Sequence, residues 1–269
     1  MKKINLNATQ KLIEKWALEC GDILNDYFYK SLKRPLKVIN KGKLGLATEA
    51  DLKSEAHIIK QIKSHFPEHK ILSEEDSFRE GNEGSFSKNQ YLWLIDPLDG
   101  TNNFYNKLPF FCVSIALYFE NEPLIGVVYN PVSGEFFSAQ KNKGAYYTRY
   151  IGGKKIRTKL VPQKKKDIGE ALLSANSRKF SPKILNNFSQ LRAMRRFGSA
   201  ALELCYVAAG LLDAYWEKGL KPWDMAAAAL VCQEAGAKIT QQNGQDFDPF
   251  AKTVLASQVF VYNEIKDLI

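Results

Sequence analysis

Long apolar runs are absent from this chain of 269 residues: none approaches the roughly 20 consecutive apolar residues that a membrane-spanning helix needs. Cysteine is scarce, with four widely separated residues and no C-x-x-C pair, which excludes a disulfide framework or a zinc-binding spacing. The first residues are two lysines and then polar residues where a signal peptide needs its apolar stretch. We therefore expect a cytoplasmic protein with reduced cysteines and no membrane-spanning segment.

Disorder is excluded by composition, because hydrophobic residues make up 45% and charged residues 25% of the chain, as in ordinary globular proteins. The length suits one large or two small domains. Positive charge is in excess, with 38 Lys and Arg against 29 Asp and Glu, a net charge of +9. Much of the surplus lies in residues 30–48 and 149–166, which contain no acidic residue.

These two basic stretches have three interpretations. They can be solvated lysine-rich surfaces, they can create a field that steers anionic substrates, or they can bind nucleic acid. The sequence has no fingerprint of a nucleic-acid-binding module, such as a zinc finger or an aromatic RNA-binding motif. We therefore favour solvation or steering.

The spacing of apolar residues predicts helices first and strands afterwards. Apolar residues between Leu6 and Phe28 recur at three- and four-residue steps, which predicts a long amphipathic helix. Thr48 or Asp51 can cap a second helix that ends at Pro67. Short apolar runs separated by turn residues follow and are typical of antiparallel strands, at 71–73, 91–95, 111–119, 124–130 and 135–140.

The second half of the chain alternates again. Residues 141–170 are predicted to form a basic connector, with a subdomain boundary that separates residues 1–148 from 149–269. Strands are expected at 171–176, 194–197 and 213–217, and helices at 181–192, 199–210 and 223–236. This alternation predicts a layered α/β (α+β) fold of two closely packed subdomains.

Acidic residues occupy unusual positions in this pattern. Glu74 follows a predicted strand, Asp96 and Asp99 follow the apolar run YLWLI, and Asp224 opens an alanine-rich helix. Singly, each has an ordinary explanation, as a β-turn, a solvated helix start or an N-terminal helix charge. Together they favour a metal site, because buried carboxylates are costly without a cation and Mg²⁺ prefers oxygen ligands. Pro97 would stiffen the turn between the two aspartates.

At this point a family resemblance appears. LIDPLDGTNNF, LPFFCVSIAL and KPWDMAAAALVCQEAGAKIT resemble the signatures of the inositol monophosphatase family of Mg²⁺-dependent, lithium-sensitive phosphatases. The similarity continues through TEADLKSE, FPEHKILSEED, GVVYNPVSGEFFSA and RRFGSAALELCYVAAGLLDAYWEKG, so that it covers residues 45–245. It implies one five-layered α-β-α-β-α sandwich of the sugar-phosphatase type, usually a homodimer, that hydrolyses small phosphate monoesters.

The resemblance also implies roles for single residues. Two or three Mg²⁺ ions would be held by Glu74, Asp96, the carbonyl of Leu98, Asp99 and Asp224. The attacking water would be positioned by Glu74, Thr101 and Asp51. The substrate would contact Asp99, Gly100 and Thr101 near its phosphate and Gly198, Ser199, Ala200 and Glu217 on its polyol side.

The chemistry of such a site needs no covalent intermediate. A pair of divalent ions about 3.5–4 Å apart lowers the pKa of a bound water and stabilises the oxygens of an in-line displacement. Cys112 is interpreted as strand packing, because a nucleophilic cysteine needs a neighbouring base. Glu217 can accept hydrogen bonds from sugar hydroxyls, which favours inositol 1-phosphate. Fructose 1,6-bisphosphate, 3′-phosphoadenosine 5′-phosphate and histidinol phosphate remain alternatives, as does an RNA- or ribosome-associated regulatory factor on this fold.

Overall fold

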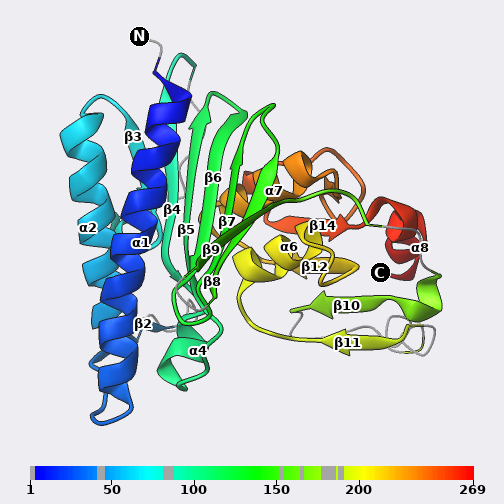
Figure 1. The fold of residues 1–269 in the computed structure, drawn as a ribbon, viewed down its shortest axis with the longest axis horizontal. Helices are drawn as coiled ribbons and strands as arrows, with labels where there is room; N and C mark the ends of the chain where they lie inside the picture. The colour runs from blue at the N-terminus through cyan, green and yellow to red at the C-terminus, as the bar shows by residue number, and fades with distance from the viewer. Residues whose placement is uncertain are drawn as a thin grey trace.

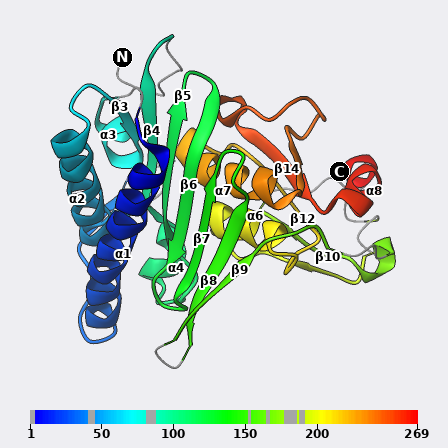
Figure 2. The same ribbon diagram turned by 45° about the horizontal axis from the view of Figure 1, so that its top comes forward.

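The structure is a computed structural model that describes residues 4–40, 46–80, 88–151, 154–163, 167–176, 186 and 191–269. Five layers follow one another across the molecule (Figures 1 and 2): two helices, a seven-stranded sheet, two helices, a five-stranded sheet and a final helix. The α-β-α-β-α sandwich expected from the family resemblance is confirmed. Across the described ranges, no helix combines the length and apolar character required to span a membrane.

The first layer consists of α1 (Leu6–Ser31) and α2 (Glu49–His65), as the sequence predicts. The two candidate caps of α2 act together, because Thr48 is the N-cap and Asp51 completes a capping box. Both helices bury their apolar faces against one side of the larger sheet. The resulting core contains Ile13, Trp16, Leu24, Ile58, Ile62, Trp93 and Ile115.

The seven-stranded sheet has the strand order of the chain itself. Its strands are β3 (Lys70–Ser73), β4 (Tyr91–Asp99), β5 (Cys112–Phe119), β6 (Glu122–Asn130), β7 (Glu135–Gln140), β8 (Ala145–Ile151) and β9 (Lys154–Lys159). All neighbours are antiparallel except β3 and β4, which are parallel and therefore correct the expectation of an antiparallel pair. Parallel neighbours need a crossover, and α3 (Glu74–Glu80) lies in the connection between them.

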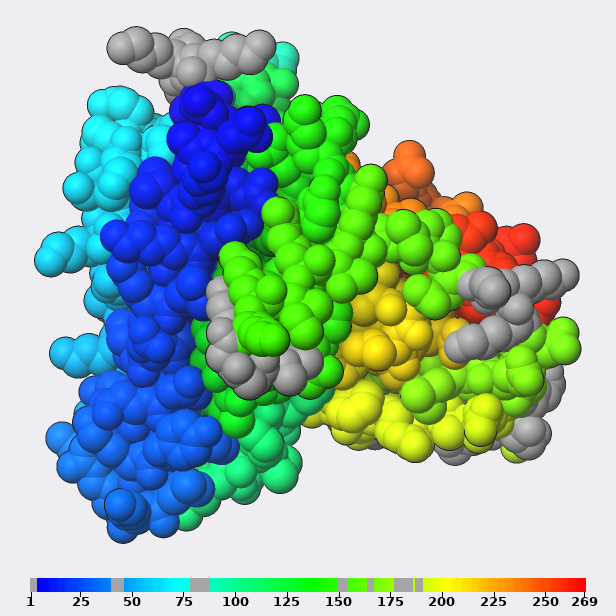
Figure 3. Space-filling model, viewed as in Figure 1, coloured from blue at the N-terminus to red at the C-terminus, as the bar shows by residue number. Residues whose placement is uncertain are grey.

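Strands β8 and β9 overturn the predicted connector at 141–170, and the boundary placed after residue 148 falls inside β8. The reason is that β9 is the edge strand and all six of its side chains are exposed, so its sequence KKIRTK has no apolar alternation. In the space-filling view (Figure 3), the green atoms of β8 and β9 lie at the surface, in the middle of the face that is shown. The division into two subdomains stays a prediction.

The third layer lies between the two sheets and consists of α6 (Ala200–Ala208) and α7 (Pro222–Ala235), both predicted from the sequence. The smaller sheet has the order β11 (Ala193–Arg195), β10 (Leu172–Ala175), β12 (Ala214–Lys218), β14 (Thr253–Ser257) and β13 (Lys238–Thr240). Helix α8 (Tyr262–Leu268) packs on its other face. Gly126 of β6 lets α7 approach, because a Cβ there would lie 2.4 Å from the Ala227 carbonyl oxygen.

The remaining elements are short. They are β1 (Val38–Asn40) paired with β2 (Leu46–Thr48), α4 (Thr101–Tyr105), and 3-10 turns at Ile168–Glu170, Pro249–Ala251 and Val259–Val261. The predicted strands at 171–176, 194–197 and 213–217 correspond to β10, β11 and β12. Most of the predicted helix at 181–192 lies outside the described residues.

Candidate active site

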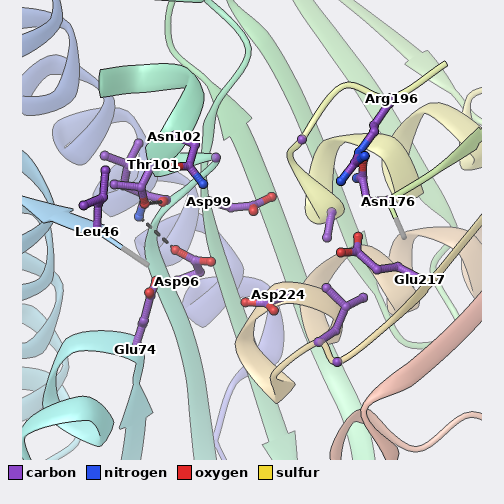
Figure 4. A pocket seen from close by; sticks show the side chains of 16 residues that line it. Leu46, Glu74, Asp96, Asp99, Thr101, Asn102, Asn176, Arg196, Glu217 and Asp224 are labelled. Carbon is purple, nitrogen blue, oxygen red and sulfur yellow. Dashed lines mark hydrogen bonds between the residues drawn. The ribbon is translucent and has the colours of Figure 1, made fainter. Parts of the chain in front are cut away.

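One cavity of about 380 Å³ collects nearly all of the predicted site residues (Figure 4). Its lining includes Glu74, Asp96, Leu98, Asp99, Gly100, Thr101, Gly198, Ala200, Glu217 and Asp224. The two other predicted residues lie behind this lining: Asp51 is hydrogen-bonded to Thr101, and Ser199 is hydrogen-bonded to Asp99. The carboxylates of Glu74, Asp96, Asp99 and Asp224 form what we call the acidic wall.

A β-bulge places Asp96 and Asp99 on the same side of the sheet. Side chains alternate along a regular strand, so residues three apart would face opposite sides. Here Asp96 pairs with Ser114 and Asp99 with Cys112, so three steps along β4 match two along β5. Pro97 cannot donate a ladder hydrogen bond, and the Leu98 N–H donates to Asp96 Oδ1 instead, at 3.0 Å. DPLD is thus a bulged strand end and not the expected turn.

Gly100 ends this strand with a φ of +91°, a conformation that side chains other than glycine rarely adopt. It is the N-cap of α4, which begins at Thr101. A Cβ at position 100 would also lie 3.0 Å from the Phe110 carbonyl oxygen. This backbone angle brings Thr101 to the cavity.

Asp51 and Thr101 meet through a buried hydrogen-bond chain. Asp51 is fully buried, and its Oδ2 accepts from the backbone N and from Oγ1 of Thr48 at 2.7 and 2.6 Å. Its other oxygen, Oδ1, lies 3.2 Å from Thr101 Oγ1, which also lies 3.0 Å from the Leu98 carbonyl oxygen. Both partners of Thr101 are acceptors, so the single hydroxyl hydrogen of Thr101 is directed to them and its lone pairs remain available.

Asp224 and Glu74 come from helix starts. Asp224 lies in the first turn of α7, where its Oδ2 accepts from the Lys221 N–H at 2.8 Å. It therefore serves as a helix cap as well as a cavity acid, so the two interpretations of this residue coexist. Glu74 is the first residue of α3, directly after β3.

Burial and mutual repulsion raise the pKa values of the three aspartates of the acidic wall. The pKa of Asp96 is raised well above its usual value by burial first and then by Glu74, Asp99 and Asp224. Burial raises the pKa of Asp99 to about 6, against the hydrogen bonds from Ser199 and Ala201. Burial and the nearby Asp99 likewise raise the pKa of Asp224 well above its usual value. Carboxylates that repel one another in this way favour the binding of positive charge.

The donor atoms of this wall suit a hard cation. Among the residues that the structure describes, no three His, Cys, Asp or Glu side chains are grouped closely enough to hold a metal ion by themselves. Instead, carboxylates from β4, α3 and α7 face one open cavity. This arrangement fits Mg²⁺, which is commonly held by one or two carboxylates together with waters and a substrate phosphate. The individual ligand assignments stay predictions.

The opposite side of the cavity contains polar residues that the sequence analysis missed, except for Glu217. Asn176, Arg196 and Glu217 lie at the carboxyl ends of β10, β11 and β12, which are mutually parallel. With Gly198 and Ala200 they form what we call the leaving-group wall (Figure 4). A signal was present, because ligands commonly bind at the carboxyl ends of parallel strands, and the predicted strands already ended at Asn176 and near Arg196.

Cys112 packs beside this site without acting in it. Its Sγ lies 3.7 Å from Asp99 Oδ2 and 3.7 Å from Ser199 Oγ. Burial and the neighbouring Asp99 raise the pKa of the thiol well above its usual value. The sulfur therefore stays protonated, as expected for strand packing, and all four cysteines are buried and free.

Comparisons with known proteins agree with this geometry. Residues 5–269 match the inositol monophosphatase family. A Nus factor SuhB from Vibrio cholerae is 37% identical over 252 residues, which cover 90% of each chain. Inositol monophosphatase 2 from Solanum lycopersicum is 37% identical over 248 residues, again 90% of each. The crystal structure of the SuhB protein from Bartonella henselae superimposes with a TM-score of 0.81 at 30% identity, over 97% of this chain and 98% of that one.

The fold and these relatives thus define a phosphatase. More narrowly, the chain belongs to the inositol monophosphatase family, whose members depend on Mg²⁺ and are sensitive to lithium.

Proposed function

We propose that the protein hydrolyses a small phosphate monoester in a Mg²⁺-dependent reaction, with inositol 1-phosphate as the preferred substrate. The supporting observation is that one cavity has two chemically different walls. The acidic wall offers carboxylates to cations and, through them, to a phosphate, whereas the leaving-group wall offers hydrogen-bonding groups. A polyhydroxylated phosphate ester presents the matching pair of ends.

The residues of the chain would act on the attacking water. The Thr101 hydroxyl donates hydrogen bonds to Asp51 Oδ1 and to the Leu98 carbonyl oxygen. The Thr101 oxygen can therefore accept a hydrogen bond from a water in the cavity. Asp51 fixes this orientation from its buried position, and Glu74 faces the same space to accept the proton of the water. When bound, Mg²⁺ lowers the pKa of that water and offsets the negative charge of the leaving oxygen. No covalent intermediate is needed.

The preference for a polyol rests on Glu217. The Tyr215 hydroxyl donates to Glu217 Oε2, and burial raises the pKa of Glu217 to about 7. An ionised Glu217 can accept further hydrogen bonds from vicinal hydroxyls of the leaving group. Beside it, Asn176 lines the same wall and adds a second polar side chain to it.

Arg196 favours a second candidate on the same site. It is exposed on the leaving-group wall, where its guanidinium could hold a further phosphate, as in fructose 1,6-bisphosphate. A nucleotide such as 3′-phosphoadenosine 5′-phosphate has less support, because the described lining residues include no aromatic side chain on which a base could stack. The structure offers nothing specific for histidinol phosphate.

A second copy of the chain and RNA are further proposed partners, with less support than the phosphate ester substrate. The family implies a homodimer. The name of the Vibrio relative and the basic strand β9 support an additional role as a regulatory factor with RNA contacts. This role would not exclude hydrolysis, since the acidic wall is present in this chain.

The test is phosphate release from a panel of inositol 1-phosphate, fructose 1,6-bisphosphate, 3′-phosphoadenosine 5′-phosphate and histidinol phosphate. Each is assayed with Mg²⁺, with EDTA and with Mg²⁺ plus Li⁺. We expect the highest kcat/KM for inositol 1-phosphate, complete dependence on Mg²⁺ and inhibition by Li⁺. A faster bisphosphate would shift the assignment to the Arg196 candidate, and no release from any member would contradict the proposed function.

A further inference from the structure

A buried glutamate that the proposed mechanism does not use lies directly behind the leaving-group wall. Glu203 is 0% exposed and is the one charged residue of α6, an otherwise apolar helix apart from Tyr206. Its Oε1 accepts from Ser174 Oγ and from the Phe197 N–H at 3.2 Å. Its Oε2 accepts from Asn176 Nδ2 at 2.6 Å and from the N–H groups of residues 198 and 199 at 3.2 and 3.3 Å.

All five partners of Glu203 are donors in these hydrogen bonds, which suits an ionised carboxylate, a group that only accepts. Three consecutive backbone N–H groups, those of residues 197–199, point at one side chain. These are groups that would otherwise lack partners where the chain enters α6. Burial raises the pKa of Glu203, and the donated hydrogen bonds oppose that rise.

The same backbone segment is held from its other side by Asn103. The Asn103 Nδ2 donates to the carbonyl oxygens of Phe110, Phe197 and Gly198 at 2.8, 2.7 and 3.4 Å. Residues 197–199 therefore lie between a side chain that binds their N–H groups and one that binds two of their carbonyls. Asn103 belongs to α4, which begins at Thr101, so this contact connects the segment to the acidic side of the cavity.

The clamped segment also reaches the cavity directly. Gly198, with a φ of +82°, lines the cavity. Asn176, whose amide also donates to Glu203, lines the cavity as well. Ser199 Oγ donates to Asp99 Oδ2 at 2.6 Å, and the Ala201 N–H donates to the same oxygen at 2.8 Å. Glu203 is thus hydrogen-bonded directly to the leaving-group wall through Asn176. It is connected to Asp99 of the acidic wall through Ser199, which donates to both carboxylates.

We propose that Glu203 is a positioning residue that sets the shape of the leaving-group wall, by fixing Asn176 and the backbone of residues 197–199, and so determines the preference for hydroxyl-bearing leaving groups. The proposal rests on the function proposed above. Glu203 touches no substrate itself. It holds the amide of Asn176 in place on the leaving-group wall, which Asn176 shares with Glu217.

Glu203→Gln tests this proposal with little change of shape. The amide NH₂ of glutamine must face at least one backbone N–H, either at residue 197 or at residues 198 and 199, and it cannot accept from it. The matched control is Glu135→Gln. Glu135 is also a buried glutamate, and it accepts from Ser133 Oγ, Tyr147 OH and Tyr206 OH at 2.8, 2.5 and 2.8 Å, but it does not line the cavity.

The first readout is discrimination between inositol 1-phosphate and p-nitrophenyl phosphate, whose leaving group has no further hydroxyl. We expect Glu203→Gln to raise the KM for inositol 1-phosphate about tenfold, the scale of one hydrogen bond to a charged group, with kcat within about threefold. The kinetics with p-nitrophenyl phosphate should change little. Glu135→Gln should lower the melting temperature by a similar amount and leave the discrimination unchanged.

The second readout is independent of activity. Amide hydrogen exchange of residues 197–199 should accelerate at least tenfold in Glu203→Gln, while the same amides in Glu135→Gln stay protected. Unchanged exchange, or unchanged discrimination despite faster exchange, would overturn the positioning role. If the parent protein releases no phosphate from any substrate, the proposed function fails. The claim that Glu203 sets substrate preference then fails with it, even if hydrogen exchange shows that Glu203 holds the amides of residues 197–199.

Discussion

The two walls of the cavity differ in how the chain builds them. The acidic wall has a local centre: Asp96 and Asp99 lie three residues apart on β4, where a bulge brings them to one side, and Glu74 and Asp224 join them from the first turns of α3 and α7. The leaving-group wall draws Asn176, Arg196 and Glu217 from three strands that are adjacent only in the folded sheet. A short motif can therefore encode the centre of the first wall, whereas the topology of the smaller sheet must form before the second wall exists. Under the proposed function, the first wall would carry the chemistry and the second wall the preference for a substrate.

The largest expected effect comes from removing one charge of the acidic wall. Asp96→Asn keeps the side-chain size but weakens the site for cations. We expect turnover at saturating Mg²⁺ to fall by at least about 10³-fold, as for loss of a main electrostatic stabiliser. The melting temperature of the metal-free protein should not fall, because Asp96 is repelled by its acidic neighbours. Steady-state kinetics and thermal unfolding measure both effects.

The control for this substitution is Asp213→Asn. Asp213 is equally buried, and its Oδ2 accepts from the Leu172 N–H at 2.8 Å, but it does not line the cavity. It should lower stability and leave turnover within about threefold. Near-normal turnover of Asp96→Asn would exclude this residue as a metal ligand.

The next effect concerns the orientation of water by Thr101. Thr101→Val preserves shape but removes the oxygen that accepts from water, and we expect kcat to fall about 10²-fold. Thr101→Ser keeps the hydroxyl and its bonds to Asp51 and Leu98, so it should retain most of the activity. Equal losses in the two variants would show that the methyl group matters and not the hydroxyl.

The limits of the sequence follow the same division. The positions of Glu74, Asp96, Asp99, Thr101 and Asp224 were predicted from motifs, and the structure brings them to one cavity. Helices α1 and α2 were predicted because their apolar spacing marks the faces that they bury, and α7 was predicted from its run of alanines. Strand β9 was missed because all of its side chains are exposed, so its sequence shows no alternation of apolar and polar residues. Glu203 was missed because its five partners are distributed over two distant segments, residues 174–176 and 197–199, although one charge in an apolar helix was a visible signal.

A smaller effect, on the ranking of substrates, is expected at the leaving-group wall itself. Glu217→Gln should change the ranking among phosphate esters by about ten- to a hundredfold, because a charged acceptor for hydroxyls is lost. The dependence on Mg²⁺ should stay as in the parent. Discrimination by the parent should also weaken as the pH falls through about 7, where Glu217 takes up a proton, and this pH dependence should vanish in the variant. An unchanged ranking would make Glu217 structural.

The acids of both walls also predict how stability depends on pH without metal. The pKa of Asp99 rises from 3.8 to about 6 on folding, and that of Glu217 from 4.5 to about 7. The folded state therefore binds extra protons between these values, so the metal-free protein should lose stability as the pH rises from about 4 to 7. Thermal unfolding in EDTA should show a melting temperature a few degrees higher at pH 5.5 than at pH 7.5. Saturating Mg²⁺ should reduce the difference, and a difference of opposite sign would contradict the arrangement.

The smallest effect is expected at the basic edge of the large sheet, outside both walls. Of the predicted basic stretches, residues 41–45, 152–153 and 164–166 lie outside the described residues, but Lys154 and Lys155 are exposed on β9. If their field steers anionic substrates, the double variant Lys154→Glu/Lys155→Glu should lower kcat/KM a few-fold at low salt. The loss should disappear in 0.5 M salt, where screening acts within a few ångströms.

Reversing Lys11 and Lys15 of α1 to Glu makes the same change of net charge on another surface, and it shows whether the field of β9 is local. A loss of equal size in both variants would indicate a general effect of net charge. Simple solvation predicts no loss in either. RNA binding predicts a gel shift of the parent at low salt that declines as a steep power of salt concentration, together with unchanged kinetics. A salt-sensitive RNA complex that only the β9 variant loses would replace steering by nucleic-acid binding at this edge.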